Sequence, residues 1–318
     1  MYRYLLFVIF FTFLLSDYGG GYAGAGFRYG SNARDISLAG SNSTVGSNGF
    51  LSFSNPANLV KVANLQLATS YFDLSLDRSI QVLSISKHLP PKAGIGISLF
   101  RSGTNNIQGR DLMNEETANF KVSDSFAMLS FGLSPIKFVS LGLNFKIQFS
   151  AINLVEEIYK ANGISFDLGI VANPISFLKV GAKIENVSGD INWKIDNGDE
   201  ARTYLELYPK LGSFSMAIEL PLSFILFLQQ DFVKPISSDL NFRTRIGLEY
   251  NGDLLDIRFG MLQKRGEKYN IEVLSNNWSF ASGFGFKFAS NYSIDYGIGF
   301  GHYSEGFGHI ISLLYEIE

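Results

Sequence analysis

Residues 139–150 alternate between apolar side chains and small or polar ones. The apolar positions are Val139, Leu141, Leu143, Phe145, Ile147 and Phe149, and the positions between them are Ser140, Gly142, Asn144, Lys146, Gln148 and Ser150. A period of two belongs to a β-strand with two different faces, and the 3.6-residue period of an α-helix does not fit it. The same alternation recurs at 164–170 and 178–185. The sequence therefore predicts an all-β protein.

Such strands suit a soluble β-sandwich, whose polar faces meet water, or a membrane β-barrel, whose apolar faces meet lipid. We predict about fourteen strands, at 64–75, 78–88, 93–103, 124–134, 138–150, 162–173, 177–187, 208–220, 222–233, 239–250, 253–264, 279–288, 291–302 and 307–317. Alternate connections are short, whereas those at 104–123, 151–161, 188–207 and 265–278 are long. Outer-membrane barrels have this asymmetry of short periplasmic turns and long external loops. It favours an antiparallel transmembrane β-barrel.

The first 25 residues have the pattern of a secretory signal peptide. Arg3 precedes an apolar run at 5–15, and Ala23, Gly24 and Ala25 form a small-residue cleavage site. The run is shorter than the roughly 20 apolar residues that a membrane-spanning helix needs. We therefore expect a signal peptide at 1–25, a plug or lid segment at 26–63 and a barrel at 64–318, located in the outer membrane of a diderm, Gram-negative-type bacterium.

Residue content argues against catalytic, cofactor and metal sites. The chain has no Cys, which excludes thiolate chemistry and disulfides, and its three His are isolated in sequence. A formal charge of −3 gives no electrostatic reason to bind nucleic acid. The glycine runs at 283–285 and 297–301 fall inside predicted strands, so we interpret them as small residues facing a barrel lumen. We predict a protein without enzymatic activity and without cofactors.

The segment GSNARDISLAGSNSTVGSNGFLSFSNPANL, at 30–59, resembles the amino-terminal segment of PorV/PorQ-type outer-membrane proteins, which are similar to the FadL-like transporters of hydrophobic compounds. The shared features are the Ala-Arg pair at 33–34 and the Asn-Pro-Ala motif of Asn55, Pro56 and Ala57 just before the first strand. The resemblance implies that this segment folds inside the barrel as a plug. We expect the motif to fix the exit of the plug into the first strand.

Two further groups of residues are candidates for a functional role. Charged side chains on one face of neighbouring predicted strands form a lumen charge cluster of Arg243, Arg245, Glu249, Asp256 and Arg258. This cluster is either an ion-pair network that stabilises the wall or a constriction that selects solutes. The long connection at 188–207 is a candidate docking loop, with aromatic residues Trp193, Tyr204 and Tyr208 in or next to it.

The resemblance implies a scaffold that docks exported proteins for a secretion and surface-attachment system. The alternative is FadL-like transport of hydrophobic small molecules. Docking is favoured because the predicted lumen is mostly Ser, Gly and charge. Its apolar exceptions are residues such as Leu83, Ile85, Phe227 and Leu262, to which the plug residues Phe50, Leu51 and Phe53 could add. The expected partners are outer-membrane lipid, secretion-system proteins or exported cargo, and a hydrophobic ligand.

Overall fold

The computed structural model describes residues 24, 27, 29–154, 158–196, 201–234, 241–263, 278–288, 291–300 and 307–317. Apart from Gly24, the predicted signal peptide at 1–25 lies outside these residues. None of the helices in the described part of the chain is long and apolar enough to span a bilayer.

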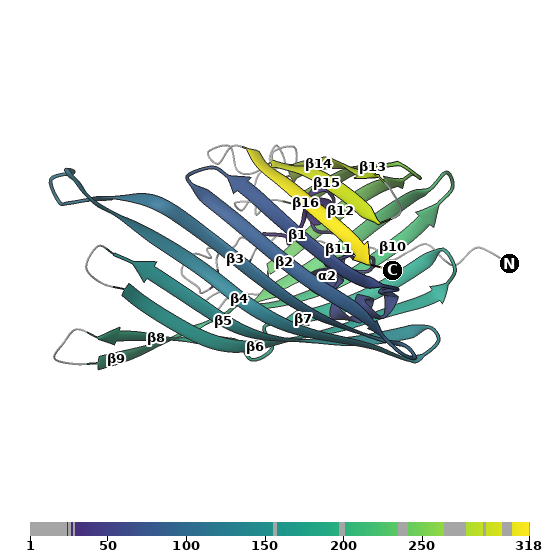
Figure 1. The fold of residues 1–318 in the computed structure, drawn as a ribbon, viewed down its shortest axis with the longest axis horizontal. Helices are drawn as coiled ribbons and strands as arrows, with labels where there is room; N and C mark the ends of the chain where they lie inside the picture. Colours follow the sequence, from purple (N-terminus) through teal and green to yellow (C-terminus); the bar gives the residue numbers. More distant parts are fainter. Residues whose placement is uncertain are drawn as a thin grey trace.

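One antiparallel sheet contains sixteen strands in the described residues and curls into a barrel (Figure 1). The strands are β1 (Leu65–Leu74), β2 (Arg78–Leu89), β3 (Ala93–Arg110), β4 (Glu116–Ile136), β5 (Val139–Asn153), β6 (Ile158–Ile175), β7 (Leu178–Glu185), β8 (Asp190–Asp196), β9 (Ala201–Leu207), β10 (Lys210–Leu220), β11 (Phe224–Lys234), β12 (Asn241–Asn251), β13 (Leu255–Gln263), β14 (Trp278–Lys287), β15 (Tyr292–Phe300) and β16 (Phe307–Ile317). The first strand pairs with the last, from Leu65 opposite Ile317 to Asp73 opposite His309. This pairing closes the barrel.

Strands β8 and β9 continue two wall strands beyond a break. Both β7 and β8 pair with β6, and a break at 186–189 separates them; β9 and β10 are separated by Tyr208 and Pro209. Without this hairpin, fourteen strands close the barrel, which confirms the predicted architecture and excludes the sandwich. The connection predicted at 188–207 is therefore largely a β-hairpin. Ile191, Trp193 and Ile195 do alternate with the polar residues of β8, but the strand is only seven residues long, which is short for a strand that crosses a membrane.

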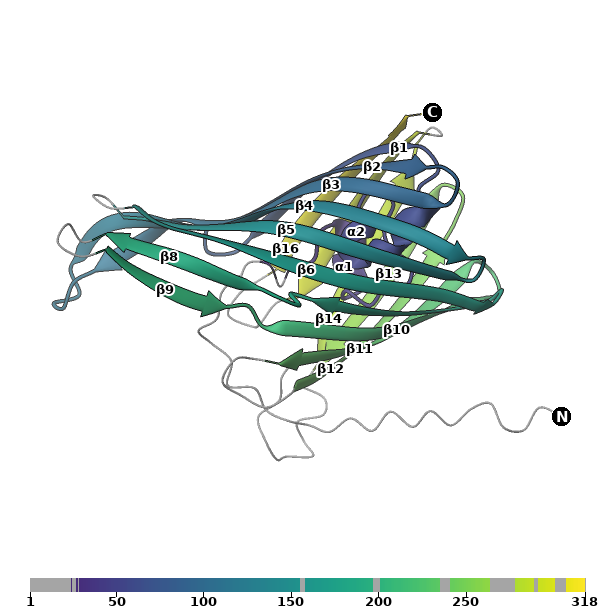
Figure 2. The ribbon, with the colours of Figure 1, turned by 90° about the horizontal axis from the view of Figure 1, so that it is seen from below.

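The two ends of the barrel differ. Short turns lie at one end together with the start of β1 and the end of β16, and we call this the periplasmic end. At the other, extracellular end, the β3–β4 hairpin and the strands after it project well past the rest of the barrel (Figure 2). The predicted loop at 104–123 is mostly strand, because β3 and β4 run for 18 and 21 residues. Polar residues on both faces of this extension hid its strand period.

The outward face carries an apolar belt. Its side chains are large and exposed, for example Leu143, Ile147, Phe166, Leu168, Phe259, Phe284 and Ile311. Inward positions on the same strands are small, polar or charged, such as Asn144, Asp167, Arg258 and Ser312, and they are buried. A closed barrel with this outer face is built to span an outer membrane.

Residues 29–62 lie inside the barrel, and we call them the plug segment. They contain α1 (Ala33–Ser37), α2 (Leu51–Ser54) and the 3₁₀ helix η2 (Pro56–Lys61) (Figure 2). Helix α1 lies against β13–β16 and η2 against β2–β6, so the segment bridges opposite walls.

Candidate functional site: the plug and the cavity beside it

Helix η2 rests directly on the backbone of the wall. A Cβ atom added at Gly94 would collide with the carbonyl of Leu59, and one at Gly142 would collide with the backbone of Pro56 and Ala57. A Cβ at Gly169 would collide with the Asn55 side chain. These glycines, together with Gly132, leave the space that the 3₁₀ helix occupies. We call this contact the glycine cradle.

The motif Asn55-Pro56-Ala57 lies in this cradle. The Asn55 side chain accepts a hydrogen bond from the Ala57 amide at 3.0 Å, which caps η2, and Pro56 occupies its first turn. The side-chain nitrogen Nδ2 of Asn55 donates to the carbonyls of Ile170 and Ala182 on β6 and β7, at 3.3 and 3.1 Å. Asn55 therefore joins the helix start to two neighbouring wall strands.

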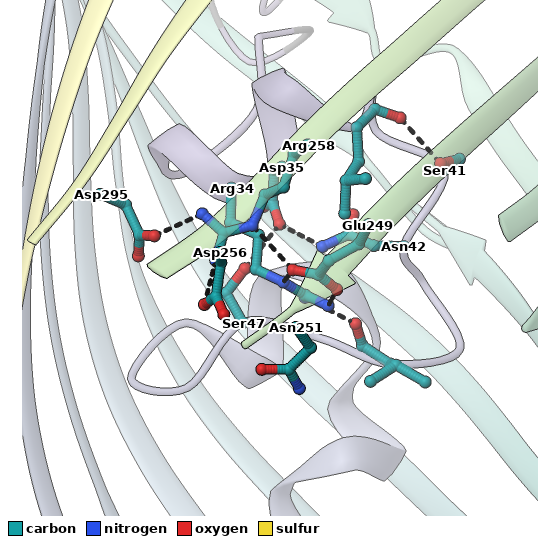
Figure 3. Close-up of polar contacts among 12 residues, drawn as sticks. Arg34, Asp35, Ser41, Asn42, Ser47, Glu249, Asn251, Asp256, Arg258 and Asp295 are labelled. Atoms are coloured by element: carbon teal, nitrogen blue, oxygen red, sulfur yellow. Dashed lines mark hydrogen bonds and ion pairs between the residues drawn. The ribbon is translucent and has the colours of Figure 1, made fainter. Parts of the chain in front are cut away.

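Helix α1 is held by charge as well as by close packing. Arg34 donates from Nε and Nη2 to the two carboxylate oxygens of Glu249, at 2.7 and 2.6 Å. The Nε atom of Arg258 donates to the same carboxylate at 2.7 Å, and its Nη2 atom donates to Asp256 at 2.9 Å (Figure 3). Asp295 also pairs with Arg258. These five residues form what we call the charged anchor.

The charged anchor is buried. Arg34, Glu249, Asp256 and Arg258 expose 9%, 2%, 6% and 3% of their surface. Burial opposes the charge on Arg34, but the Glu249 carboxylate outweighs that effect and holds the pKa of Arg34 above its ordinary value. Bidentate arginine–carboxylate pairing fixes orientation as well as distance. The Arg34–Glu249 pair therefore ties α1, which lies against β13–β16, to β12 as well.

The five residues of the predicted lumen charge cluster separate into two groups. Glu249, Asp256 and Arg258 belong to the charged anchor, which Arg34 and Asp295 complete. Arg245 instead pairs with Asp231 at 2.5 Å and donates to the Ala39 carbonyl at 2.7 Å, while Arg243 lines a cavity. Arg34 was not predicted as a partner, because it is distant in the chain and its pairing depends on how the plug is seated. Asp231 was not predicted either, and its pairing with Arg245 depends on the register of β11 against β12.

A cavity of about 460 Å³ lies inside the barrel on the extracellular side of η2. One wall of it, formed by Phe27, the plug segment and β1–β4, is aromatic and apolar. It contains Phe27, Phe53, Phe72, Phe100, Phe126 and Met128. The Phe100 and Phe126 rings stack with centroids 5.0 Å apart, and Phe27 meets Phe126 edge-on at 5.1 Å. We call this the aromatic wall.

The opposite wall is charged, but its charges are paired. Lys146 lies 2.7 Å from Asp167, Lys183 lies 2.8 Å from Glu185, and Arg245 pairs with Asp231. Lys146 also lies over the Phe126 ring at 5.4 Å from its centroid, at the border of the two walls. The cavity is thus two-sided, with an apolar surface facing polar groups.

The predicted apolar lumen residues are placed differently from one another. Leu83 and Ile85 were expected inside, but they are 48% and 42% exposed and face outward, so this prediction is wrong. Ile80 and Val82 on the same strand face inward instead. Both parities of β2 are apolar here, so alternation could not identify the inner face. Leu262 and Phe53 line the cavity, whereas Phe227 packs against Leu38 and Phe50 packs in the core beside α2.

The three candidate docking aromatics do not form one exposed surface. Trp193 is partly buried and donates from Nε1 to Glu206 at 2.9 Å. Tyr208 is 4% exposed and lines the cavity. Tyr204 on β9 is 61% exposed.

Comparisons with known proteins identify the fold. No protein-family model matches the sequence, and no curated protein matches it. Among solved structures, the toluene transporter TodX of Pseudomonas putida is similar with a TM-score of 0.68 at 13% identity, covering 91% of this chain and 99% of that one. A FadL homologue of Pseudomonas aeruginosa gives 0.66 at 13% identity, with 91% and 98% covered. The toluene transporter TbuX of Ralstonia pickettii gives 0.63 at 11% identity, with 91% and 99% covered.

At these identities the likeness concerns the fold. It supports the FadL side of the resemblance drawn from the sequence, and it does not show that the chain is of the PorV/PorQ type. The chain thus has the fold of these outer-membrane proteins, a barrel closed by fourteen strands.

Proposed function

We propose that this protein is an outer-membrane conduit for hydrophobic small molecules, which bind in the cavity beside the plug. The observation that carries this proposal is the aromatic wall inside a barrel lumen. A water-filled barrel for hydrophilic solutes has a polar interior. Six apolar side chains meeting at one cavity instead offer an unsolvated surface for an apolar ligand.

The cavity size is suitable for such a ligand. Ligand pockets are typically 300–1,000 Å³, mostly apolar, with a few placed polar groups. The cavity of about 460 Å³ is in this range, and its charged wall supplies polar groups opposite the rings. Similarity of fold to the toluene transporters TodX and TbuX supports the same class of solute.

The plug segment has a role in this proposal. Because η2 and α1 bridge opposite walls on the periplasmic side of the cavity, they would hold a bound molecule and prevent free diffusion of water-soluble solutes. Passage then requires a local movement of the plug, and the two contacts of the plug with the wall decide which part moves.

Docking of exported proteins, which the sequence favoured, receives less support. Of the three aromatic residues expected to form the docking surface, Tyr208 is directed to the cavity and Trp193 is engaged with Glu206. Their position does not offer a shared external surface for a partner. Transport is therefore the function that we propose.

The test combines ligand binding with uptake. Phe100→Gln/Phe126→Gln should weaken binding of the fluorescent hydrophobic probe N-phenyl-1-naphthylamine to the purified barrel by about tenfold or more, because burying one Phe side chain contributes roughly 1.5–3 kcal/mol. Uptake of a labelled monoaromatic compound by cells should fall with it. Tyr204→Gln, an exposed aromatic outside the cavity, is the matched control and should behave as wild type. Unchanged probe binding and uptake in the double variant would exclude the cavity as the route.

A further inference from the structure

Two pairs of lysines face each other across strand ladders on the outside of the barrel. Lys160 on β6 is the direct cross-strand partner of Lys194 on β8, and Lys210 on β10 is the partner of Lys234 on β11. Like charges directly opposite one another destabilise a sheet. An anion bound between the members of each pair would remove this repulsion.

All four side chains point outward. Ala161 on β6 and Ile191 on β8 have the opposite parity to Lys160 and Lys194, and they are buried on the inner side with exposures of 6% and 0%. Ser213 and Val233, which fix the parity of the second pair, are each 6% exposed and line the cavity. The four lysines occupy the opposite parity and are exposed. They belong to the same surface as the apolar belt.

No carboxylate neutralises these lysines within the part of the chain that the structure describes. Among the described residues, neither an ion pair nor a side-chain hydrogen bond involves any of the four. By contrast, Lys146, Lys179, Lys183 and Lys287 each pair with an Asp or Glu. Among the outward acids of β8 whose side chains the structure describes, Asp190 lies four residues from Lys194, which is roughly 13 Å along an extended strand.

Both pairs lie where the apolar belt ends on the extracellular side. Ile164 on β6 and Leu207 on β9, nearer the membrane than the first pair, are 48% and 43% exposed. Phe214, four residues from Lys210, is 44% exposed. Moving up β6 and β10, the outward side chains change from apolar to cationic within two outward positions, and on β6 one apolar side chain, Ile158, lies beyond Lys160. This boundary is the depth at which lipid headgroups meet a barrel.

We propose that the two lysine pairs bind phosphate groups of lipid headgroups in the outer leaflet. A phosphate between two opposed ammonium groups removes their repulsion and satisfies both charges, and lysine binds phosphate as a point charge. The surface is continuous with the lipid-facing belt, so lipid is already its neighbour. A soluble anion or an acidic protein would have to compete with headgroups held there at high local concentration.

Native mass spectrometry of the detergent-solubilised full chain with added bisphosphorylated lipid A measures this binding. Lys160→Gln/Lys194→Gln and Lys210→Gln/Lys234→Gln should each weaken the apparent affinity, by about fivefold for each lysine removed. Gln preserves most of the side-chain length, and heat-modifiable gel mobility verifies that each variant is a folded barrel. Lys87→Gln/Lys92→Gln is the matched control, because both lysines are exposed at the periplasmic end. It should bind lipid A as wild type does.

Two comparisons identify the bound group. Dephosphorylated lipid A should bind more weakly than the phosphorylated form to the wild type and equally to the variants. Unchanged binding in both pair variants, or equal loss in the periplasmic control, would overturn the proposal. Displacement of lipid A by millimolar inorganic phosphate would assign the lysines to a soluble anion and would also overturn it, as would retention of a co-purifying acidic protein in place of lipid.

Discussion

The plug segment meets the barrel wall in two different ways. At α1 the contact is the charged anchor, in which Arg34 and Arg258 share Glu249. At η2 it is the glycine cradle, in which the helix backbone touches β3–β6 where side chains are missing. One contact depends on charges that must be paired in a buried site, and the other depends on shape and a few hydrogen bonds from Asn55.

The difference has a consequence for movement. A buried ion pair that loses a partner leaves an uncompensated charge, so the charged anchor should hold until it is disrupted as a whole. A helix resting on glycines can shift by small amounts as long as Asn55 keeps its carbonyl partners. We therefore expect the α1 end to be the fixed part of the plug and the η2 end to be the part that can move.

Deletion of residues 29–54 should have the largest effect. It removes α1, α2 and the Arg34 side chain, but it leaves η2 in its cradle and all strand pairings of the barrel intact. We expect a folded barrel whose single-channel conductance in planar bilayers is several times that of the full chain. An unchanged conductance in a folded deletion variant would mean that this part of the plug does not occlude the lumen.

Glu249→Gln should destabilise the barrel strongly. The substitution keeps the shape of the side chain but leaves Arg34 without its carboxylate partner, and breaking a buried ion pair by removing one partner costs about 3–5 kcal/mol. Urea unfolding in lipid vesicles, followed by tryptophan fluorescence, measures the change in free energy. The control is Glu219→Gln, which breaks the exposed pair with Lys179 and should cost about 0–1 kcal/mol. Equal losses in the two variants would show that the charged anchor contributes no more than a surface pair.

Much of this arrangement could be predicted from the sequence. Strict alternation identified the lipid-facing and inner faces of β5 and β6. The glycines predicted to face inward also do so: Gly283 lies against Ser37 of the plug, and Gly297 lies against Ala33. The inward parity of Glu249 and Arg258 also followed from alternation. These predictions succeeded because one face of each strand is apolar and the other is not.

Other parts could not be predicted, and the reason is physical. Towards their extracellular halves β1–β4 carry apolar residues on both faces, since the outer one meets lipid and the inner one forms the aromatic wall. Alternation therefore gave no signal for Phe72, Phe100 or Phe126, and the lumen was expected to be more polar than it is. The pairing of Arg34 with Glu249 depends on how the plug sits, and that of Asp295 with Arg258 depends on the register across β14. No local pattern encodes either one.

Gly142→Val tests the glycine cradle. The new side chain would collide with the backbone of Pro56 and Ala57, so η2 must shift away from β5. Overpacking of this kind costs about 1–3 kcal/mol, less than loss of the charged anchor, while conductance should rise because the displaced turn opens the periplasmic side. Gly212→Val is the control, because its Cβ would meet atoms only at 3.8 Å or beyond. A closed channel in a folded Gly142→Val barrel would contradict the idea that the η2 end is the movable part.

Asn55→Ala should have the smallest effect and the most specific one. It removes the cap on the Ala57 amide and both hydrogen bonds to the carbonyls of β6 and β7, but it introduces no bulk and no charge. Loss of an N-cap costs about 0.5–2 kcal/mol, so the barrel should remain folded while η2 becomes freer to leave its cradle. Limited proteolysis near residue 61 from the periplasmic side should then become faster, whereas Asn55→Asp, which keeps the cap but loses the donor to the wall, should fall between Ala and wild type. If cleavage in Asn55→Ala is as slow as in wild type, shape alone holds η2, and the hydrogen bonds of Asn55 contribute nothing to seating the plug.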